Sequence, residues 1–314
     1  MIKEVKQSTK LIFSGGTGRS GTTIIGKLLG RHPEVRLSQP VEIKFLAANA
    51  GLIDLTFGRR DFIELKKRKS WSYRLLSRVP GFTEWSLAQN FRRRLRHDWW
   101  DSGTVPGKGV GLSSGVSVEI REEAYERFKR ERRRDPRSAA LTFFWKMIES
   151  QSNNQGEPNW IDTSPPNIFN ADRIHSLLPE ARFIHMKRDG RNTIASVLKE
   201  HWGPSDPMAA IYWWKNRIIA SHQALAKVPE GQVIEIQLEE LAQFDRESQY
   251  QRLLGFLELS DAPAMREYFD HEVKGERVVA ARWQEELNEA KFLDRFRKVH
   301  RELADLGIEA KLYD

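Results

Sequence analysis

The residues best suited to chemistry lie in a glycine-rich segment near the N-terminus. The apolar residues 11–13 are followed by the sequence Ser-Gly-Gly-Thr-Gly-Arg-Ser-Gly-Thr-Thr at positions 14–23. Glycines at positions 16, 18 and 21 allow backbone conformations that other residues avoid, so amide groups there can converge on an anion. A helical pattern that starts at Thr22 would point its positive dipole end at the same place. The segment therefore predicts a phosphate-binding loop between a strand and a helix.

The spacing of this loop nearly matches the nucleotide-binding pattern G-x-x-x-x-G-K-[ST]. Gly16, Gly21 and Thr23 fall on three of its fixed positions, but Thr22 stands where the pattern has lysine. The cation of the loop comes earlier, as Arg19. These differences predict a loop that binds a phosphate, but not the triphosphate of a magnesium-dependent kinase.

A second charged segment points to another anion site. The apolar residues 183–186 are followed by Lys-Arg-Asp-Gly-Arg-Asn at positions 187–192, which leads into a helical pattern. Arg188 lies at the turn, and Ser196 follows about two helical turns later. A guanidinium and a hydroxyl at this spacing could hold a second phosphate.

Five short apolar runs alternate with helical patterns and predict the elements that position these residues. The predicted strands are residues 11–13, 35–38, 160–163, 181–186 and 233–236. Helices are expected at residues 42–50, at 168–178, and across 119–153 with an interruption near Pro136. This order predicts an α/β fold with a P-loop-type, mostly parallel sheet flanked by helices. Ligands bind beyond the carboxyl ends of the strands in such folds, where both charged segments begin.

Composition limits the class of protein. The chain has 314 residues, 39% of them hydrophobic and 30% charged, and we expect a single domain over 1–314 with a basic helical insertion at 51–155. The net charge of +8 favours anionic ligands. The absence of cysteine excludes disulfides and thiolate chemistry. No apolar signal core or membrane-spanning run is present, so a cytoplasmic location is expected.

The two charged segments together resemble the nucleotide-dependent sulfotransferases, in particular the branch with bacterial small-molecule, tyrosylprotein and heparan sulfate enzymes. Residues 18–23 resemble the loop for the 5′-phosphosulfate, and residues 183–191 with Ser196 resemble the 3′-phosphate segment. Residues 162–167 are similar to a Lys-Thr-Pro-x-Asn stretch, although Asp162 and Thr163 stand where lysine-containing variants are common. Arg282-Trp283 resembles a third element. The resemblance covers residues 11–50 and 160–305, and residues 51–155 match no pattern of the family.

This resemblance implies the donor 3′-phosphoadenosine 5′-phosphosulfate (PAPS) and a reaction without a metal. The residues that it implies for the 5′-phosphosulfate are Gly18, Arg19, Ser20, Gly21, Thr22 and Thr23. Arg19 would also reach the sulfuryl group as charge develops there. The 3′-phosphate would be held by Arg188 and Ser196, with Arg282 as a further candidate.

Residues 41–46 resemble the element that carries the proposed base of this branch. The resemblance implies that Glu42 accepts the proton of the acceptor and that Lys44 orients the acceptor or the sulfuryl group. Read without the resemblance, Glu42 could instead stabilise the start of a helix through the helix dipole. Three tryptophans, Trp202, Trp213 and Trp214, are expected in the core rather than stacked on an adenine, and Trp202, near the Arg188 helix, is the one that could instead reach the ligand.

The basic insertion leaves the acceptor open. Arg130, Arg133, Arg134 and Arg137 would share one face of a helix. Such a face can be merely solvated, or it can attract an anionic acceptor, an anionic membrane surface or nucleic acid. We expect a small-molecule, lipid or sugar acceptor, possible peripheral contact with an anionic membrane, and no nucleic acid. The remaining alternatives are a P-loop kinase of a nucleoside or small metabolite and a non-catalytic basic binding protein.

Overall fold

The computed structural model describes residues 9–60, 81–101, 111–278 and 283–313. Its centre is a five-stranded sheet with the order β2-β3-β1-β4-β5, in which every neighbouring pair is parallel. The strands are β1 (Lys10–Gly16), β2 (Val35–Leu37), β3 (Asn159–Asp162), β4 (Arg182–Lys187) and β5 (Val233–Gln237). Because all strands run the same way, their carboxyl ends meet at one edge of the sheet.

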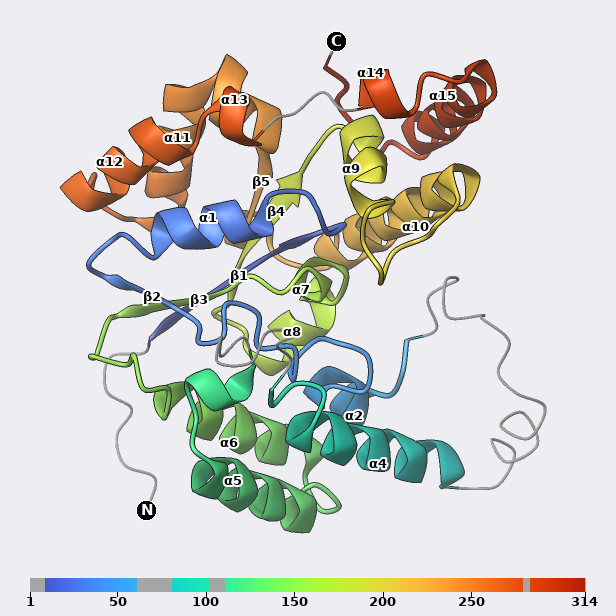
Figure 1. The fold of residues 1–314 in the computed structure, drawn as a ribbon. Helices are drawn as coiled ribbons and strands as arrows, with labels where there is room; N and C mark the ends of the chain where they lie inside the picture. Colours follow the sequence, from blue (N-terminus) through green and yellow to red (C-terminus); the bar gives the residue numbers. More distant parts are fainter. Residues whose placement is uncertain (1–8, 61–80, 102–110, 279–282, 314) are drawn as a thin grey trace.

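Helices connect the strands and cover both faces of the sheet (Figure 1). The helices in the first half of the chain are α1 (Thr22–Leu29), α2 (Leu52–Phe57), α4 (Phe82–Arg96), the short 3-10 helix Leu112–Ser114, α5 (Val118–Glu131) and α6 (Pro136–Glu149). Those that follow β3 and β4 are α7 (Pro166–Phe169), α8 (Ala171–Leu177), α9 (Gly190–Val197) and α10 (Pro207–Leu225). The short helix Glu230–Gln232 precedes β5, and the π-helix Glu240–Phe244, α11 (Arg246–Leu257), α12 (Pro263–Glu272), α13 (Gly275–Val278), α14 (Trp283–Glu286) and α15 (Ala290–Asp305) follow it.

Alternate residues of each strand face opposite layers of helices, as the period of a strand requires. Ile12 and Ile184 pack into a cluster that includes apolar residues of α1, α11 and α12. Phe13 and Phe183 face the other side, in a cluster shared with α6 and α8. The sheet is thus buried on both faces, which explains why its strands are nearly continuous apolar runs.

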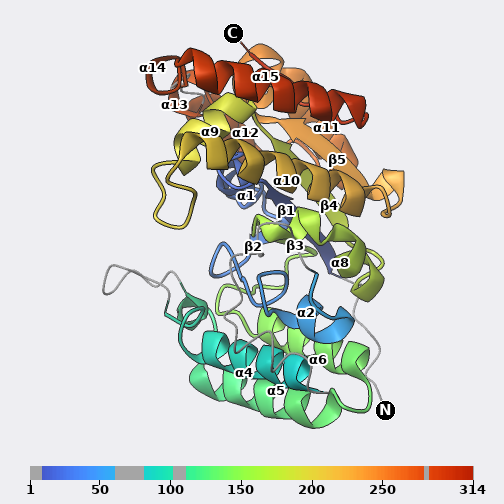
Figure 2. The same cartoon turned by 90° about the vertical axis from the view of Figure 1, so that its right-hand side faces the viewer.

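Two helical groups extend this core at opposite ends of the molecule (Figures 1 and 2). At one end, α10 packs against α9 and α15 around a third apolar cluster that contains Trp214 and Phe296. At the other end, α4, α5 and α6 lie together and bury Phe91 between Phe128 and Phe143. The second group lies between β2 and β3 in the chain, where the sequence predicted a basic helical insertion.

The predicted fold class is confirmed, but one predicted element is wrong. Residues 41–50 form turns rather than a helix, and Lys44 and Ala50 have φ angles of 53° and 59°, which no right-handed helix allows. The helix predicted at 168–178 is divided at Asn170, whose φ of −121° ends α7. Within the described residues, none of the helices combines the length and the apolar character that a membrane span needs.

Candidate active site

The glycine-rich loop joins β1 to α1 at the carboxyl edge of the sheet (Figure 1). Gly18 and Gly21 have φ angles of 88° and 95°, in the left-handed region that glycine adopts without strain. Gly21 is also the N-cap of α1, and the first turn of α1 contains no acidic residue. The first amide groups of a helix lack acceptors within the helix and lie at its positive end. The loop therefore offers an anion both backbone donors and a favourable dipole.

The Arg188 turn joins β4 to α9 at the same edge. Asp189 is fully buried and caps α9 by accepting the Arg191 amide at 2.8 Å. The Asp189 amide in turn donates to the carboxylate of Glu239, which follows β5, at 2.9 Å. The backbone on both sides of Asp189 is thus fixed by buried hydrogen bonds, and these bonds set the position of Arg188.

The loop and the Arg188 turn contact each other directly. The guanidinium of Arg188 donates through Nη1 to the Arg19 carbonyl at 3.1 Å. The side chain of Arg19 donates through Nε to Ser196 Oγ at 3.0 Å and pairs with Glu200 at 3.2 Å. Arg19 and Ser196, which we predicted for opposite ends of a donor, are therefore neighbours. In this structure the guanidinium of Arg19 is directed toward α9 and the turn that follows it.

Glu42 and Lys44 lie on the turn segment 41–50, which crosses the same edge after β2. Burial raises the pKa of Glu42 above the ordinary value of 4.5, nearby Lys44 opposes the rise, and Asp162 adds to it. A carboxyl group with a raised pKa is a stronger base once it is deprotonated. The pair can thus supply a proton acceptor and a cation to a ligand.

The carboxylate of Asp162, at the end of β3, holds this segment in place. Asp162 is fully buried and accepts the Ile43 amide at 3.0 Å, between Glu42 and Lys44. It also accepts the hydroxyl and the amide of Ser164 and the side-chain amide of Asn167 at 2.7 Å. Burial raises the pKa of Asp162, while these hydrogen bonds oppose the rise. Asp162 therefore positions the backbone of the Glu42 segment, a structural role that the sequence did not predict.

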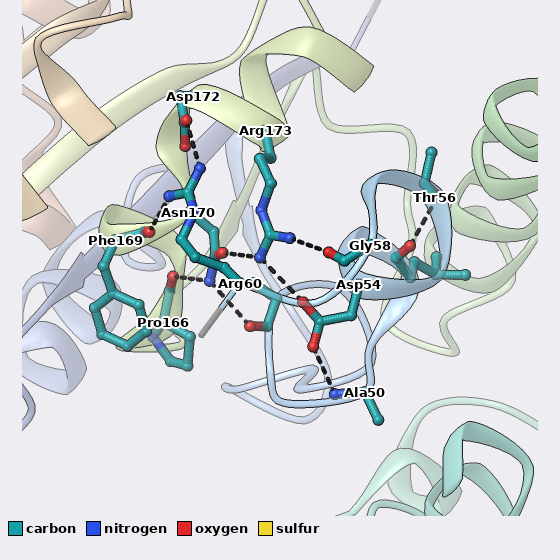
Figure 3. Close-up of polar contacts among 12 residues, drawn as sticks. Ala50, Asp54, Thr56, Gly58, Arg60, Pro166, Phe169, Asn170, Asp172 and Arg173 are labelled. Atoms are coloured by element: carbon teal, nitrogen blue, oxygen red, sulfur yellow. Dashed lines mark hydrogen bonds and ion pairs between the residues drawn. The ribbon is translucent and has the colours of Figure 1, made fainter. Parts of the chain in front are cut away.

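A second polar network fixes the other end of the segment (Figure 3). Asn170 donates through Nδ2 to the Ala47 carbonyl at 3.2 Å and contacts the guanidinium of Arg173. Arg173 pairs with Asp54 of α2 at 3.1 Å, and Asp54 accepts the Ala50 amide at 2.9 Å. The side chains of Arg173 and Asp54 are only 11% and 9% exposed. The network connects α2 to α8 and encloses the end of the Glu42 segment.

These elements surround one cavity of about 970 Å³ at the carboxyl edge of the sheet. Its volume is near the upper end of the range for small-molecule sites, about 300–1,000 Å³. The described residues that line it come from the loop, the Glu42 segment, the start of α7, the Arg188 turn with α9, and α10. They are Gly18, Arg19, Gly21, Thr22, Thr23, Ile24, Glu42, Lys44, Ala48, Ser164, Pro165, Pro166, Arg188, Asn192, Ser196, His201, Trp202, Arg217 and Leu238.

The cavity thus brings together most of the residues that the sequence singled out. Ser20 is an exception, because it is 1% exposed and absent from the lining. Arg282 lies outside the described residues. Trp213 and Trp214 are buried as predicted, but Trp202 is wrongly predicted as core, since it is 49% exposed and lines the cavity.

Sequence reasoning missed Arg217, Asn192 and Ser164 as lining residues. Asn192 is 3% exposed and could have been found, because it belongs to the same charged turn as Arg188. Arg217 offered no such signal, since it lies inside the aromatic helix α10 and far from every motif. Its position is known only from the fold.

Known proteins resemble this chain in sequence and in fold. The profile of the Sulfotransferase family matches residues 12–263. A protein of Caenorhabditis briggsae described as "Putative protein-tyrosine sulfotransferase" is 23% identical over 274 residues, which are 86% of this chain and 72% of that protein. Sulfotransferase STF9 from Mycobacterium avium has a similar fold, with a TM-score of 0.50 and 14% identity over 99% of this chain and 80% of that one. The sulfotransferase domain of the Synechococcus PCC 7002 olefin synthase aligns with 99% of both chains at 13% identity and a TM-score of 0.48. Because the family profile matches residues 12–263 of its 314 residues, the chain belongs to the sulfotransferase family.

Proposed function

We propose that this protein transfers a sulfuryl group from PAPS to a hydroxyl or amine of a small-molecule, lipid or sugar acceptor, without a metal ion. The observation that carries the proposal is the single cavity that the loop, the Arg188 turn and the Glu42 segment share. A nucleotide with a phosphate at each end needs two anion-binding elements that open into one space. The volume of about 970 Å³ is sufficient for such a ligand together with a small acceptor.

The residues divide into two groups in this proposal. The amides of the loop and the hydroxyls of Thr22 and Thr23 bind the 5′-phosphate at the positive end of α1. Arg188 and Ser196 bind the 3′-phosphate, where a guanidinium matches the geometry of phosphate oxygens. Arg19, whose Nε donates to Ser196 Oγ in this structure, lies between the two groups. When PAPS binds, the guanidinium of Arg19 would donate to oxygens of the donor in place of that hydroxyl.

The chemistry that the donor supplies is a sulfuryl group on a good leaving group. The sulfur–oxygen bond to the 5′-phosphate breaks as a new bond forms to the acceptor, and the bisphosphate leaves with the electron pair. Glu42 takes the acceptor proton, which a base with a raised pKa does efficiently. Lys44 adds positive charge beside the acceptor. Positioning and electrostatic stabilisation are sufficient for such a transfer.

Ligand-dependent thermal stability tests the donor. We expect adenosine 3′,5′-bisphosphate with EDTA to raise the Tm more than ADP with magnesium does. At 100 times its Kd, a ligand that binds only the folded protein adds about 2.7 kcal/mol of stability. A preference for ADP with magnesium would support a kinase instead. A lack of response to both ligands, with salt-sensitive retention on DNA, would support a basic nucleic-acid-binding protein.

Turnover tests the reaction itself. The purified protein is incubated with PAPS and EDTA and with one acceptor at a time, for instance a phenol, a monosaccharide or a long-chain alcohol. We expect release of bisphosphate and formation of a sulfate ester with at least one acceptor class. Turnover that appears only after a divalent metal is added would contradict the metal-independent reaction.

A further inference from the structure

Arg217 is a cavity-lining cation that belongs to no motif of the sequence. It lies in α10 and donates through Nη1 to the carbonyl of Thr17, 200 positions away, at 3.0 Å. Its guanidinium lies 4.3 Å from the ring of Trp213 and 5.4 Å from the ring of Phe169. A cation–π contact with Trp213 and a hydrogen bond to Thr17 together hold the guanidinium in place. Arg217 is therefore a preorganised cation at the start of the loop.

Its position complements that of Arg188. Arg217 donates to the carbonyl of Thr17 and Arg188 to the carbonyl of Arg19, so the two guanidinium groups bind the residues before and after Gly18. The loop itself carries Thr22 where related nucleotide-binding loops have lysine. Its own cation, Arg19, is directed to Ser196 and Glu200. On the Thr17 side of the loop, the positive charge comes from α10.

The same residue also contacts α7, whose first residue and the turn before it line the cavity. Phe169 belongs to α7, and the residues just before it, Ser164, Pro165 and Pro166, line the cavity. The hydroxyl of Ser164 accepts the amide of Lys44 at 3.4 Å. Arg217 therefore lines the same cavity as the loop and as Glu42 and Lys44, between which the transfer is proposed to take place.

We propose that Arg217 is a further catalytic residue, which donates hydrogen bonds to the sulfuryl oxygens during the transfer. This inference rests on the proposed function. A guanidinium has five N–H donors in one plane, so it can hold a loop carbonyl and an anion at the same time. A donor that is already in place when charge develops stabilises the transition state without reorganisation. Arg217 thus supplies, from a distant helix, charge that the loop lacks at position 22.

The test compares R217M and R217K with the matched control K215M. Lys215 lies on the same helix and pairs with Glu302. For each protein, kcat, the KM of the acceptor and the Kd of adenosine 3′,5′-bisphosphate are measured, with the best acceptor from the turnover screen. We expect R217M to lower kcat by about 10²–10³-fold, the usual effect of removing one such donor. The Kd of the bisphosphate, which has no sulfuryl group, should change little, and K215M should behave like the wild type.

Chemical rescue separates a catalytic role from a structural one. Added ethylguanidinium should restore part of the activity of R217M and leave K215M unaffected. A matching loss of bisphosphate affinity would overturn the proposal and make Arg217 a phosphate-binding or loop-positioning residue. A higher acceptor KM with unchanged kcat would make it an acceptor-binding residue. If R217M does not fold, the kcat, the acceptor KM and the bisphosphate Kd of R217K are compared with those of the wild type instead. Failure of the proposed function itself is seen earlier, as a wild-type protein that does not turn over PAPS.

Discussion

At the scale of single residues, the raised pKa of Glu42 gives the proposed base a measurable signature. We expect E42Q to lower kcat by about 10²–10⁴-fold, the usual contribution of a general base. The Kd of adenosine 3′,5′-bisphosphate should stay near the wild-type value, because the donor is proposed to bind to the loop and the Arg188 turn. Replacement of the exposed Glu180 by glutamine is the matched control. Near-wild-type turnover by E42Q would remove Glu42 from the role.

The pH dependence of kcat/KM provides a second readout on the same residue. A base works only when deprotonated, so activity should be present above the pKa of Glu42 and decline as pH falls through it. Because burial raises that pKa, the midpoint of the acid limb should lie above 4.5. In E42Q this limb should disappear. A limb that is unchanged in E42Q would show that another group titrates there.

A functional residue could be predicted only where residues close to it in the sequence determine its environment. The loop and the Arg188 turn were predictable because spacing of a few residues determines their backbone. Arg217 was not, since its bond to Thr17 joins residues 200 positions apart. The side-chain environment of Trp202 was also beyond the sequence, because an aromatic residue gives the same local signal in a core and at the mouth of a cavity.

At the scale of elements, Asp162 is expected to position the segment that carries Glu42. In D162N an amide N–H₂ would face the donors of Ser164, Asn167 or Ile43. A buried donor without an acceptor costs about 1–3 kcal/mol. We therefore expect D162N to lower the free energy of unfolding by roughly that amount, measured by urea denaturation, and to lower kcat more than the affinity for bisphosphate.

The control for Asp162 is S38A, because the hydroxyl of Ser38 makes the longest hydrogen bond to that carboxylate, at 3.4 Å. We expect S38A to have a small effect on both measurements. If D162N loses stability but keeps its full kcat, Asp162 supports the fold alone.

The Asp54–Arg173 pair is expected to be the strongest link between α2 and α8 (Figure 3). Removing one partner of a buried ion pair leaves the other charge without compensation and costs about 3–5 kcal/mol. We expect R173M to lower the free energy of unfolding by an amount in that range. The exposed pair Arg297–Asp294 is the matched comparison, and R297M should cost less than about 1 kcal/mol.

A double-mutant cycle distinguishes the ion pair from simple loss of packing. In D54N/R173M neither charge is left buried alone, so part of the stability lost in R173M should return. Additive losses in the double variant would contradict a direct coupling. The same network explains the wrongly predicted helix at residues 42–50. Its hydrogen bonds to the Ala47 carbonyl and the Ala50 amide favour turns that local helix propensity does not reveal.

At the scale of the whole molecule, the fold class followed from the alternation of strand and helix patterns, while the function of the α4–α5 region did not. The spacing of apolar residues along each segment is a local property of the sequence, and in the structure it determines which side chains face each side of the sheet. The region between β2 and β3 matched no known pattern, so only its charge and helical character were predictable. Its surface chemistry depends on how α4 and α5 pack.

The packing of α4 against α5 forms a cavity lined by cationic and apolar residues. This cavity of about 380 Å³ is lined by Arg92, Arg130 and Arg133, together with the apolar Phe91 and Tyr125 and the acidic Glu126. Within the described part of the chain, none of these three arginines forms an ion pair. The neighbouring Trp85 also lines this cavity and is 57% exposed. Arginines around an exposed tryptophan suit the boundary between lipid headgroups and acyl chains better than the surface of a nucleic acid.

We therefore expect the surface around this cavity to bind anionic membranes. Vesicles of phosphatidylcholine with phosphatidylglycerol should sediment the protein, those of phosphatidylcholine alone should not, and salt should weaken the binding. Each cation near such a surface contributes about 1 kcal/mol, so R92E/R130E/R133E should lower the affinity by at least about 100-fold. The triple change K291E/K298E/R301E on exposed positions of α15 alters the net charge equally and is the control. Equal losses in both variants would attribute binding to net charge alone, and binding to DNA with the same arginine dependence would identify nucleic acid as the partner instead.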